Sequence, residues 1–331
     1  MNLKMKESMN LQDLKNSDLL TAIYVNSNHL KQKELLEQTL YSISKQTYLT
    51  DLLVLHPKFS ASELKTLKKS LENPTIKGIK KDEKGQPVLD EKGNHIEEDI
   101  KSDIKINYIL FETKSDNFSK IFNEAFNIAL ENKYDMLSII EPEDVVGFNW
   151  FKTAFVYLKE NDDVSIFFPI VRNTSNGVFA GYMNEASWAE GLSEEAGKFD
   201  MNLLNKFNCA VPLGAIYRID RVRDDSECKD DGKYYPFKES IKLSHSYEFF
   251  LRMIYNDLKS MTIPRVGYEL KSYMRDYFEE TSAKIPQNVA AIPVEKGGVT
   301  PEEGKFWMEL AKKEYFYEED RNKQYEPTEQ K

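Results

Sequence analysis

Three acidic side chains follow directly on an apolar run near the middle of the chain. The run "YDMLSII", residues 134–140, leads into Glu141, Glu143 and Asp144. Carboxylate oxygens are the ligands that Mg²⁺ and Mn²⁺ prefer in proteins. In open parallel sheets, ligands bind beyond the carboxyl ends of the strands. If residues 134–140 form a buried strand, the three acids therefore predict a divalent-metal site, and a polar turn without a ligand is the alternative.

The elements around these acids alternate between short apolar runs and amphipathic stretches. We expect strands at residues 18–26, 51–57, 105–112, 134–140, 164–171, 209–220 and 260–270. We expect helices at residues 28–48, 60–73, 117–132, 147–161 and 244–259, with Ser60 or Ser62 as an N-cap. Residues 173–208 read as loop and short helix. This alternation predicts an α/β domain, a mostly parallel sheet flanked by helices.

Composition excludes several classes of protein. The 331 residues carry a net charge of −10, which disfavours a nucleic-acid-binding protein, because phosphate binding needs clustered Lys and Arg. Two cysteines are too few for a disulfide scaffold or a Cys-rich zinc site. The N-terminus has no apolar signal region, and no run approaches the roughly 20 apolar residues of a membrane span. We therefore expect a soluble, cytoplasmic protein.

The rhythm of the chain divides it into three parts: an N-terminal arm at residues 1–18, a main domain at 19–275 and an extension at 276–331. Residues 77–105 contain "DEKG" twice and are expected to form an inserted, exposed hairpin or mobile loop, either a partner contact or a solvated insertion. In the extension, a capping box at Thr300 predicts a helix at about 301–317, a second possible protein contact, before a disordered end.

Five segments, taken in order, resemble the family 2 glycosyltransferases, which have the GT-A nucleotide-sugar-binding fold. The resemblance spans roughly residues 19–270, and its most recognisable run is "SISKQTY" at 42–48. The other four are "TAIYVNSN", "FSKIFNEAFNIAL", "MLSIIEPEDVV" and the closing block from "GKYYPFKES" to "IPRVGYEL". Their order and spacing, rather than any one motif, carry the resemblance.

This resemblance implies a GT-A-like enzyme of the hexosyltransferase type. Such an enzyme transfers a sugar, with inversion, from a nucleoside-diphosphate sugar to a hydroxyl of a glycan or protein acceptor, and uses Mn²⁺ or Mg²⁺ to neutralise the leaving diphosphate. Carried over by position, the metal ligands are Glu141, Glu143 and Asp144, and Asn26 and Asn123 line the donor pocket. Lys58, which follows the second expected strand, is a further candidate that would meet a phosphate, with a surface turn as the alternative. His245 is the expected general base, with Glu248 as the other candidate.

The chain also departs from the family pattern. Where the family has an acidic pair after the second strand, this sequence has His56-Pro57-Lys58. The metal motif has Glu in place of two Asp residues, and His245-Ser246 replaces an acidic pair at the position of the base. Two hypotheses follow: an active glycosyltransferase with rebuilt donor contacts, or an inactive GT-A-fold protein that serves as a structural or binding subunit of a larger assembly.

Overall fold

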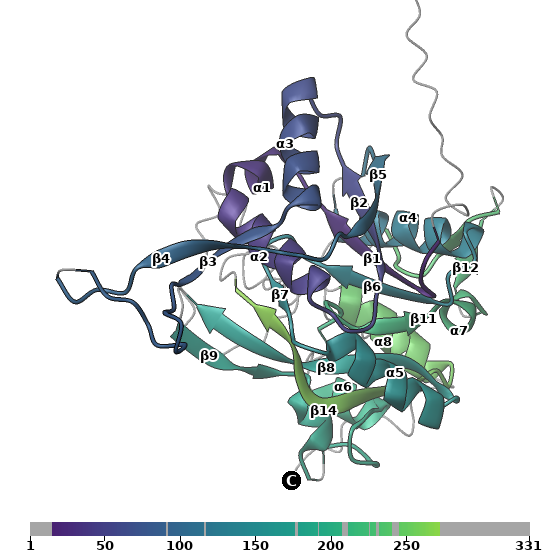
Figure 1. The fold of residues 1–331 in the computed structure, drawn as a ribbon. Coiled ribbons are helices and arrows are strands. Elements are labelled where there is room, and N and C mark those ends of the chain that lie inside the picture. The colour runs from purple at the N-terminus through teal and green to yellow at the C-terminus, as the bar shows by residue number, and fades with distance from the viewer. Residues whose placement is uncertain are drawn as a thin grey trace, which may run out of the picture.

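The computed structural model describes residues 15–271 except 91, 116, 176–177, 191, 207–210, 225, 230–231 and 240–244. One end of its main sheet consists of four parallel strands in the order β5-β2-β1-β6, with β5 at the edge (Figure 1). They are β1 (Leu19–Tyr24), β2 (Asp51–His56), β5 (Asn107–Glu112) and β6 (Met136–Ile140). β1, β2 and β6 are almost wholly buried. The predicted α/β class, a parallel sheet flanked by helices, is confirmed.

The sheet continues beyond β6 as a mixed sheet. β11 (Ile216–Arg218) runs antiparallel between β6 and β8 (Val164–Ser175), and β14 (Lys259–Leu270) runs parallel to β8. Three further strands pair with β14 and β8. β7 (Val145–Val146) and β10 (Lys198–Phe199) pair with β14, and β9 (Val178–Met183) pairs with β8. β9 lies within the segment expected to be loop and short helix, so that expectation is wrong there.

Helices cover this sheet, and most lie where the apolar spacing predicts them (Figure 1). They are α1 (Ser27–Lys31), α2 (Lys33–Ser44), α3 (Ala61–Glu72), α4 (Phe118–Glu131), α5 (Trp150–Glu160), η2 (Glu185–Trp188), α6 (Met201–Lys206), α7 (Ile219–Asp224) and α8 (His245–Tyr255). The helix expected at 28–48 is interrupted at Gln32, whose ψ of 48° lies outside the helical region. α7 replaces the end of the strand expected at 209–220.

The N-cap of α3 is Ser60 rather than Ser62. The Ser60 side chain accepts a hydrogen bond from the Glu63 backbone N–H, and the Glu63 carboxylate accepts one from the Ser60 backbone N–H, which completes a capping box. Ser27 at the start of α1 donates to the same carboxylate at 2.6 Å. The hydrogen bond from Ser27, followed by those from Ser60, lowers the pKa of Glu63 to about 2.

Most of the segment 77–105 belongs to an exposed hairpin. β3 (Thr75–Ile79) and β4 (Glu97–Lys101) pair antiparallel, and this hairpin projects away from the rest of the described chain (Figure 1). Asp82 and Asp90 each accept hydrogen bonds at one carboxylate oxygen from backbone N–H groups two and four residues on, so the two "DEKG" repeats form two matching turns.

The remaining described elements are β12 (Glu227–Cys228) and β13 (Tyr234–Tyr235), which pair with each other. The arm up to residue 14 and the extension from 272, including the helix expected at 301–317, lie outside the described residues. Within the residues that are described, none of the helices combines the length and the apolar character needed to cross a membrane.

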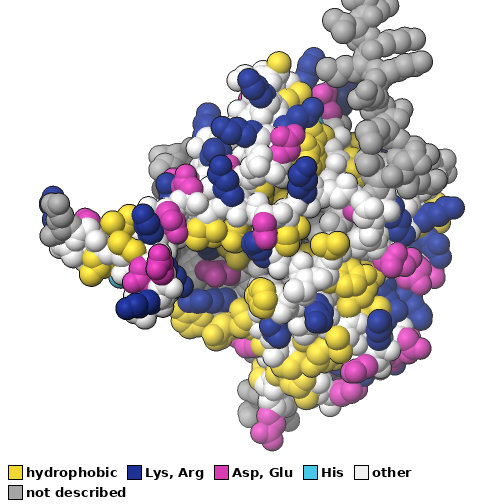
Figure 2. Space-filling view, viewed as in Figure 1, with side chains coloured by type: hydrophobic (Ala, Val, Ile, Leu, Met, Phe, Trp, Pro, Cys, Tyr) yellow, Lys and Arg dark blue, Asp and Glu magenta, His cyan; other side chains and the backbone are white. Residues whose placement is uncertain are grey.

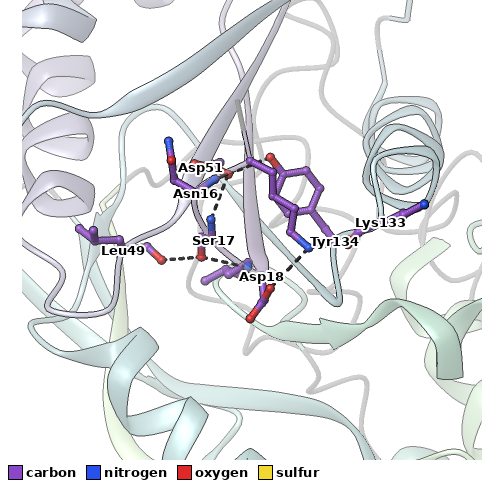
Figure 3. Close-up of polar contacts among 9 residues, drawn as sticks. Asn16, Ser17, Asp18, Leu49, Asp51, Lys133 and Tyr134 are labelled. Atoms are coloured by element: carbon purple, nitrogen blue, oxygen red, sulfur yellow. Dashed lines mark hydrogen bonds and ion pairs between the residues drawn. The ribbon is translucent and has the colours of Figure 1, made fainter. Parts of the chain in front are cut away.

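Asp51 ties together several segments at the amino edge of the sheet (Figure 3). Its side chain is 1% exposed. The carboxylate accepts hydrogen bonds from the backbone N–H groups of Asn16 and Ser17 at 2.9 and 3.3 Å, from the Tyr134 hydroxyl at 2.9 Å and from the Asn107 amide at 2.6 Å. Burial and this carboxylate raise the pKa of Tyr134 well above its ordinary range.

Replacing Asp51 with alanine should lower the free energy of unfolding by about 3 kcal/mol, because it leaves several buried donors without an acceptor. Urea denaturation followed by circular dichroism measures this change. Asp163 is the matched control: it is half-exposed and pairs with Lys259 at 2.5 Å, so Asp163→Ala should cost less than about 1 kcal/mol. Equal effects of the two substitutions would contradict the role given to Asp51.

Candidate functional site

The carboxyl ends of three neighbouring parallel strands bring several predicted site residues to one edge of the sheet. Ile23 lies opposite Ile140, and Tyr24 lies opposite Leu55, so β1, β2 and β6 end side by side. Asn26, Lys58 and Glu141 follow directly on these strand ends. The structure therefore brings these three residues to a common edge of the sheet.

At this edge, Asn26 also has a local structural task. It is the N-cap of α1, and its side-chain oxygen accepts hydrogen bonds from the backbone N–H groups of Asn28 and His29 at 2.9 and 3.2 Å. His56, the last residue of β2, is buried and stacks on Phe59 with ring centroids 5.0 Å apart, whereas Lys58, two residues later, is exposed. Lys58 is the side chain of this turn that can reach a ligand.

The acidic turn at Glu141–Asp144 is fastened to the end of β14. Tyr268 contributes one hydroxyl that accepts a hydrogen bond from the Glu141 backbone N–H at 3.1 Å and donates to Asp144 Oδ2 at 2.7 Å. The Lys271 backbone N–H donates to Asp144 Oδ1 at 3.0 Å. Asp144 has no exposed surface. Its carboxylate therefore holds the turn on β14.

A shared metal ion fits only part of the predicted ligand set. Both Asp144 oxygens are buried and accept hydrogen bonds from β14 and the residue after it, so this carboxylate does not fit a ligand role. Glu141 and Glu143 are partly exposed, and their oxygens are of the kind that Mg²⁺ and Mn²⁺ prefer. No group of three or more His, Cys, Asp or Glu side chains suited to a metal occurs among the described residues.

The acidic turn is positioned from its other side by α2 and the residues after it. Four hydrogen bonds reach the segment 144–149: Thr39 Oγ1 to the Asp144 carbonyl at 2.7 Å, Val146 N–H to Ser42 Oγ at 3.0 Å, Gln46 Nε2 to the Gly147 carbonyl at 3.0 Å, and Thr47 Oγ1 to Asn149 Oδ1 at 2.6 Å. Ser42, Gln46 and Thr47 belong to the "SISKQTY" run. This positioning role was not predicted.

Close backbone contacts complete the support of the turn. The Gly147 N–H donates to the Gly267 carbonyl at 2.8 Å, and a Cβ on Gly147 would lie 2.9 Å from the Gly267 backbone. Gly214 has a φ of +72°, and a Cβ there would lie 2.5 Å from the Tyr268 ring. The glycines thus let β14, with Tyr268 on it, reach the acidic turn.

Asn123 has a different position from the predicted one in the donor pocket. It is 3% exposed, and its amide forms two hydrogen bonds with the backbone of Phe237: Nδ2 donates to the carbonyl at 2.8 Å and Oδ1 accepts from the N–H at 2.9 Å. One turn later on α4, Asn127 makes the same pair of contacts with Tyr234. Both asparagines clamp the segment 234–237, so the amide of Asn123 faces the protein rather than a ligand.

The two candidate bases lie on α8. His245 is its first residue, and its side chain is outside the described residues. Glu248 is fully buried, and its Oε1 lies 3.0 Å from Arg252 Nε and 3.2 Å from Lys238 Nζ. A buried, doubly ion-paired carboxylate does not face an acceptor. The structure therefore corrects the candidate catalytic role of Glu248 to one of holding Lys238 and α8 together.

A cavity of about 1130 Å³ lies against α1, α2, the end of α3 and the base of the β3–β4 hairpin. Its wall carries charges of both signs, several of which pair with each other, as Lys33 does with Glu37 at 3.1 Å and Lys77 with Asp99 at 2.6 Å. None of Glu141, Glu143 and Asp144 lines it. This cavity is therefore separate from the acidic turn.

Comparison with known proteins gives structural likeness without a family. No family model matches the chain, and no curated protein matches it. The solved structure of S. aureus TarS 1–349 is similar at a TM-score of 0.47 and 13% identity, over 76% of this chain and 60% of that one. The same protein in complex with UDP gives 0.47 and 12%, over 91% and 72%.

A mannosyltransferase from Pyrobaculum calidifontis, PcManGT in complex with GDP-Man and Mn²⁺, is similar at a TM-score of 0.46 and 11% identity, over 78% of this chain and 58% of that one. The chain thus spans about 60% of the length of the first of these structures. At these values no family is assigned, and the function has to be argued from the residues of this chain.

Proposed function

We propose that this chain is a glycosyltransferase that binds a nucleoside-diphosphate sugar at the carboxyl edge of β1, β2 and β6. One observation carries the proposal. The segment that most resembles the family 2 glycosyltransferases, with Ser42, Gln46 and Thr47, is bonded to the segment 144–149 that directly follows Glu141 and Glu143. The resemblance in sequence and the geometry of the edge therefore point to the same site.

The groups at this edge suit a diphosphate. Lys58 is exposed and cationic at the end of β2, so it would contact phosphate oxygens. Glu141 and Glu143 would hold Mn²⁺ or Mg²⁺, with phosphate oxygens and water as the other ligands, a common arrangement for Mg²⁺. The ion would supply positive charge against the leaving diphosphate. Asn26, which follows β1 at the same edge, would line the donor pocket, and its side chain also caps α1.

Transfer itself needs a base. The acceptor hydroxyl oxygen would attack the anomeric carbon from the face opposite the diphosphate, so that the configuration is inverted as the bond to the diphosphate breaks. The hydroxyl proton has to pass to a general base, and His245 is the residue we propose, because an imidazole can take up a proton near neutral pH. Glu248 and Asp144 act on the position of the surrounding segments.

Calorimetry with UDP, GDP, CDP, ADP and dTDP, each with Mn²⁺ and with EDTA, tests the proposal. We expect one or two nucleotides to bind in the micromolar range, about −8 kcal/mol, and more weakly in EDTA. Lys58→Ala should weaken the binding of the same nucleotide. Lys68 on α3 is also exposed, and Lys68→Ala should leave that binding unchanged. If a folded sample binds none of the five nucleotides, the proposal of an active glycosyltransferase is wrong, and an inactive GT-A-like protein is favoured.

A further inference from the structure

The β8–β9 hairpin extends the sheet past the edge at which the acidic turn lies. Tyr182 on β9 is opposite Arg172 on β8, Arg172 is opposite Glu269 on β14, and Glu269 is opposite Val145 on β7. Residues opposite each other on neighbouring strands share one face of a sheet. Three strand spacings, about 14 Å, thus separate Tyr182 from the residue that follows Asp144.

Aromatic rings are exposed at the far end of this row. Phe179 and Tyr182 are 48% and 49% exposed, with ring centroids 4.9 Å apart and tilted by 58°. The guanidinium carbon of Arg172 lies 5.8 Å from the Phe179 ring. Figure 2 shows hydrophobic side chains gathered over β9 at the rim of a hollow in the surface. Single exposed apolar residues are normal, but rings that pack on each other in the open form a patch.

Polar groups stand beside these rings. Arg172 is exposed and has five N–H donors, and Glu269, next to it in the row, is partly exposed. Thr174 donates to Glu269 Oε1 at 3.2 Å, which orients that carboxylate. A ring surface with a fixed acceptor and a cationic donor next to it suits a ligand that has apolar C–H faces and a rim of hydroxyl groups. Carbohydrates have this combination.

We propose that Phe179, Tyr182, Arg172 and Glu269 form the binding surface for a carbohydrate acceptor, whose reactive end reaches along the row toward the acidic turn. The inference rests on the proposed function and deepens it, because it selects a glycan over a protein as the acceptor. The rings take the apolar faces of sugar units, Arg172 donates to hydroxyl oxygens and Glu269 accepts from hydroxyl groups.

The test is a binding experiment on the full chain with an array of immobilised oligosaccharides built from glucose, N-acetylglucosamine, galactose and mannose. Three proteins are compared: the native chain, the double variant Phe179→Ala/Tyr182→Ala, and Leu49→Ala. Leu49 is 62% exposed and precedes β2 at the opposite edge of the sheet, so it controls for the loss of an exposed apolar side chain. Thermal melting checks that all three proteins are folded. Because the substituted side chains are exposed, their melting temperatures should differ little from that of the native chain.

We expect the native chain and Leu49→Ala to bind the same oligosaccharide, and the double variant to bind it about tenfold or more weakly, as for aromatic anchors elsewhere. Arg172→Ala should weaken the binding of this oligosaccharide as well. Binding of no oligosaccharide by the native chain, or unchanged binding by the double variant, would overturn the inference. So would light scattering that shows a native dimer dissociated by the double variant. Nucleotide calorimetry on the same samples reports separately on the proposed function.

Discussion

Replacing Glu143 with alanine should remove the Mn²⁺-dependent part of nucleotide binding and leave the fold intact. Glu143 is partly exposed in the turn after β6, and removing one of two proposed carboxylate ligands deprives the ion of charge and of a bond. We expect the affinity for the bound nucleotide in Mn²⁺ to fall by roughly tenfold or more, about 1.4 kcal/mol, to the value in EDTA. Titration calorimetry in Mn²⁺ and in EDTA measures both.

Asp144→Asn is the matched variant and should behave in the opposite way. An asparagine side chain turns one of the two accepting oxygens into a donor, which then faces either the Tyr268 hydroxyl or the Lys271 N–H. The buried site loses at least one hydrogen bond, so the free energy of unfolding should fall by about 1–3 kcal/mol. At a temperature where the variant is folded, its response to Mn²⁺ should be that of the native chain.

The two variants therefore separate a ligand from a positioning residue. If Asp144→Asn lost the response to Mn²⁺ without losing stability, Asp144 would be a metal ligand, as the sequence alone predicts. If Glu143→Ala bound nucleotide natively in Mn²⁺, the proposed metal ligands would be wrong. Tyr268→Phe gives a further check, because it removes the hydroxyl that donates to Asp144 and accepts from the Glu141 N–H, and it should destabilise the chain in the same direction.

The parts of the fold that the sequence predicted are those with a strong local pattern of apolar residues, either a continuous run or a helical spacing. β1, β2 and β6 are buried along nearly their whole length and read as continuous apolar runs, and α4 has a clear apolar face. Because parallel strands end at a common edge, the residues that follow these runs, Asn26, Lys58 and Glu141, lie at one edge of the sheet. β9 was missed because nearly all of its residues face solvent, so "VFAGYM" has no alternation of buried and exposed positions.

The parts that could not be predicted depend on contacts between distant segments. Asp144 reads as a metal ligand until Tyr268, 124 residues later in the chain, is found to donate to it. Asn123 similarly meets Phe237, 114 residues later. Neither pairing leaves a period or a motif in the sequence. One signal was present: a Tyr between Gly267 and Glu269 at the end of an apolar strand, where a buried hydroxyl needs partners.

Glu248 has its role through partners close to it in the sequence, and its loss should have a large effect on stability. Its carboxylate has no exposed surface and is bonded to Arg252, 12% exposed, and to Lys238. Glu248→Ala removes the carboxylate that accepts from Arg252 Nε. The guanidinium keeps its hydrogen bond to the Pro236 carbonyl but loses this paired negative charge in a nearly buried setting. Removing one partner of a buried ion pair typically costs about 3–5 kcal/mol, and urea denaturation should show a loss of that size.

Two comparisons make this result specific to burial and to structure. Glu195 pairs with Lys198 at 2.6 Å but is 67% exposed, so Glu195→Ala should cost less than about 1 kcal/mol. Glu248→Gln keeps the shape of the side chain and should lose part of the stability, because an amide cannot neutralise Arg252. If Glu248→Gln were as stable as the native chain and yet lost sugar transfer to a bound acceptor, Glu248 would be a base after all. The burial of its carboxylate between two cations argues for the loss of stability.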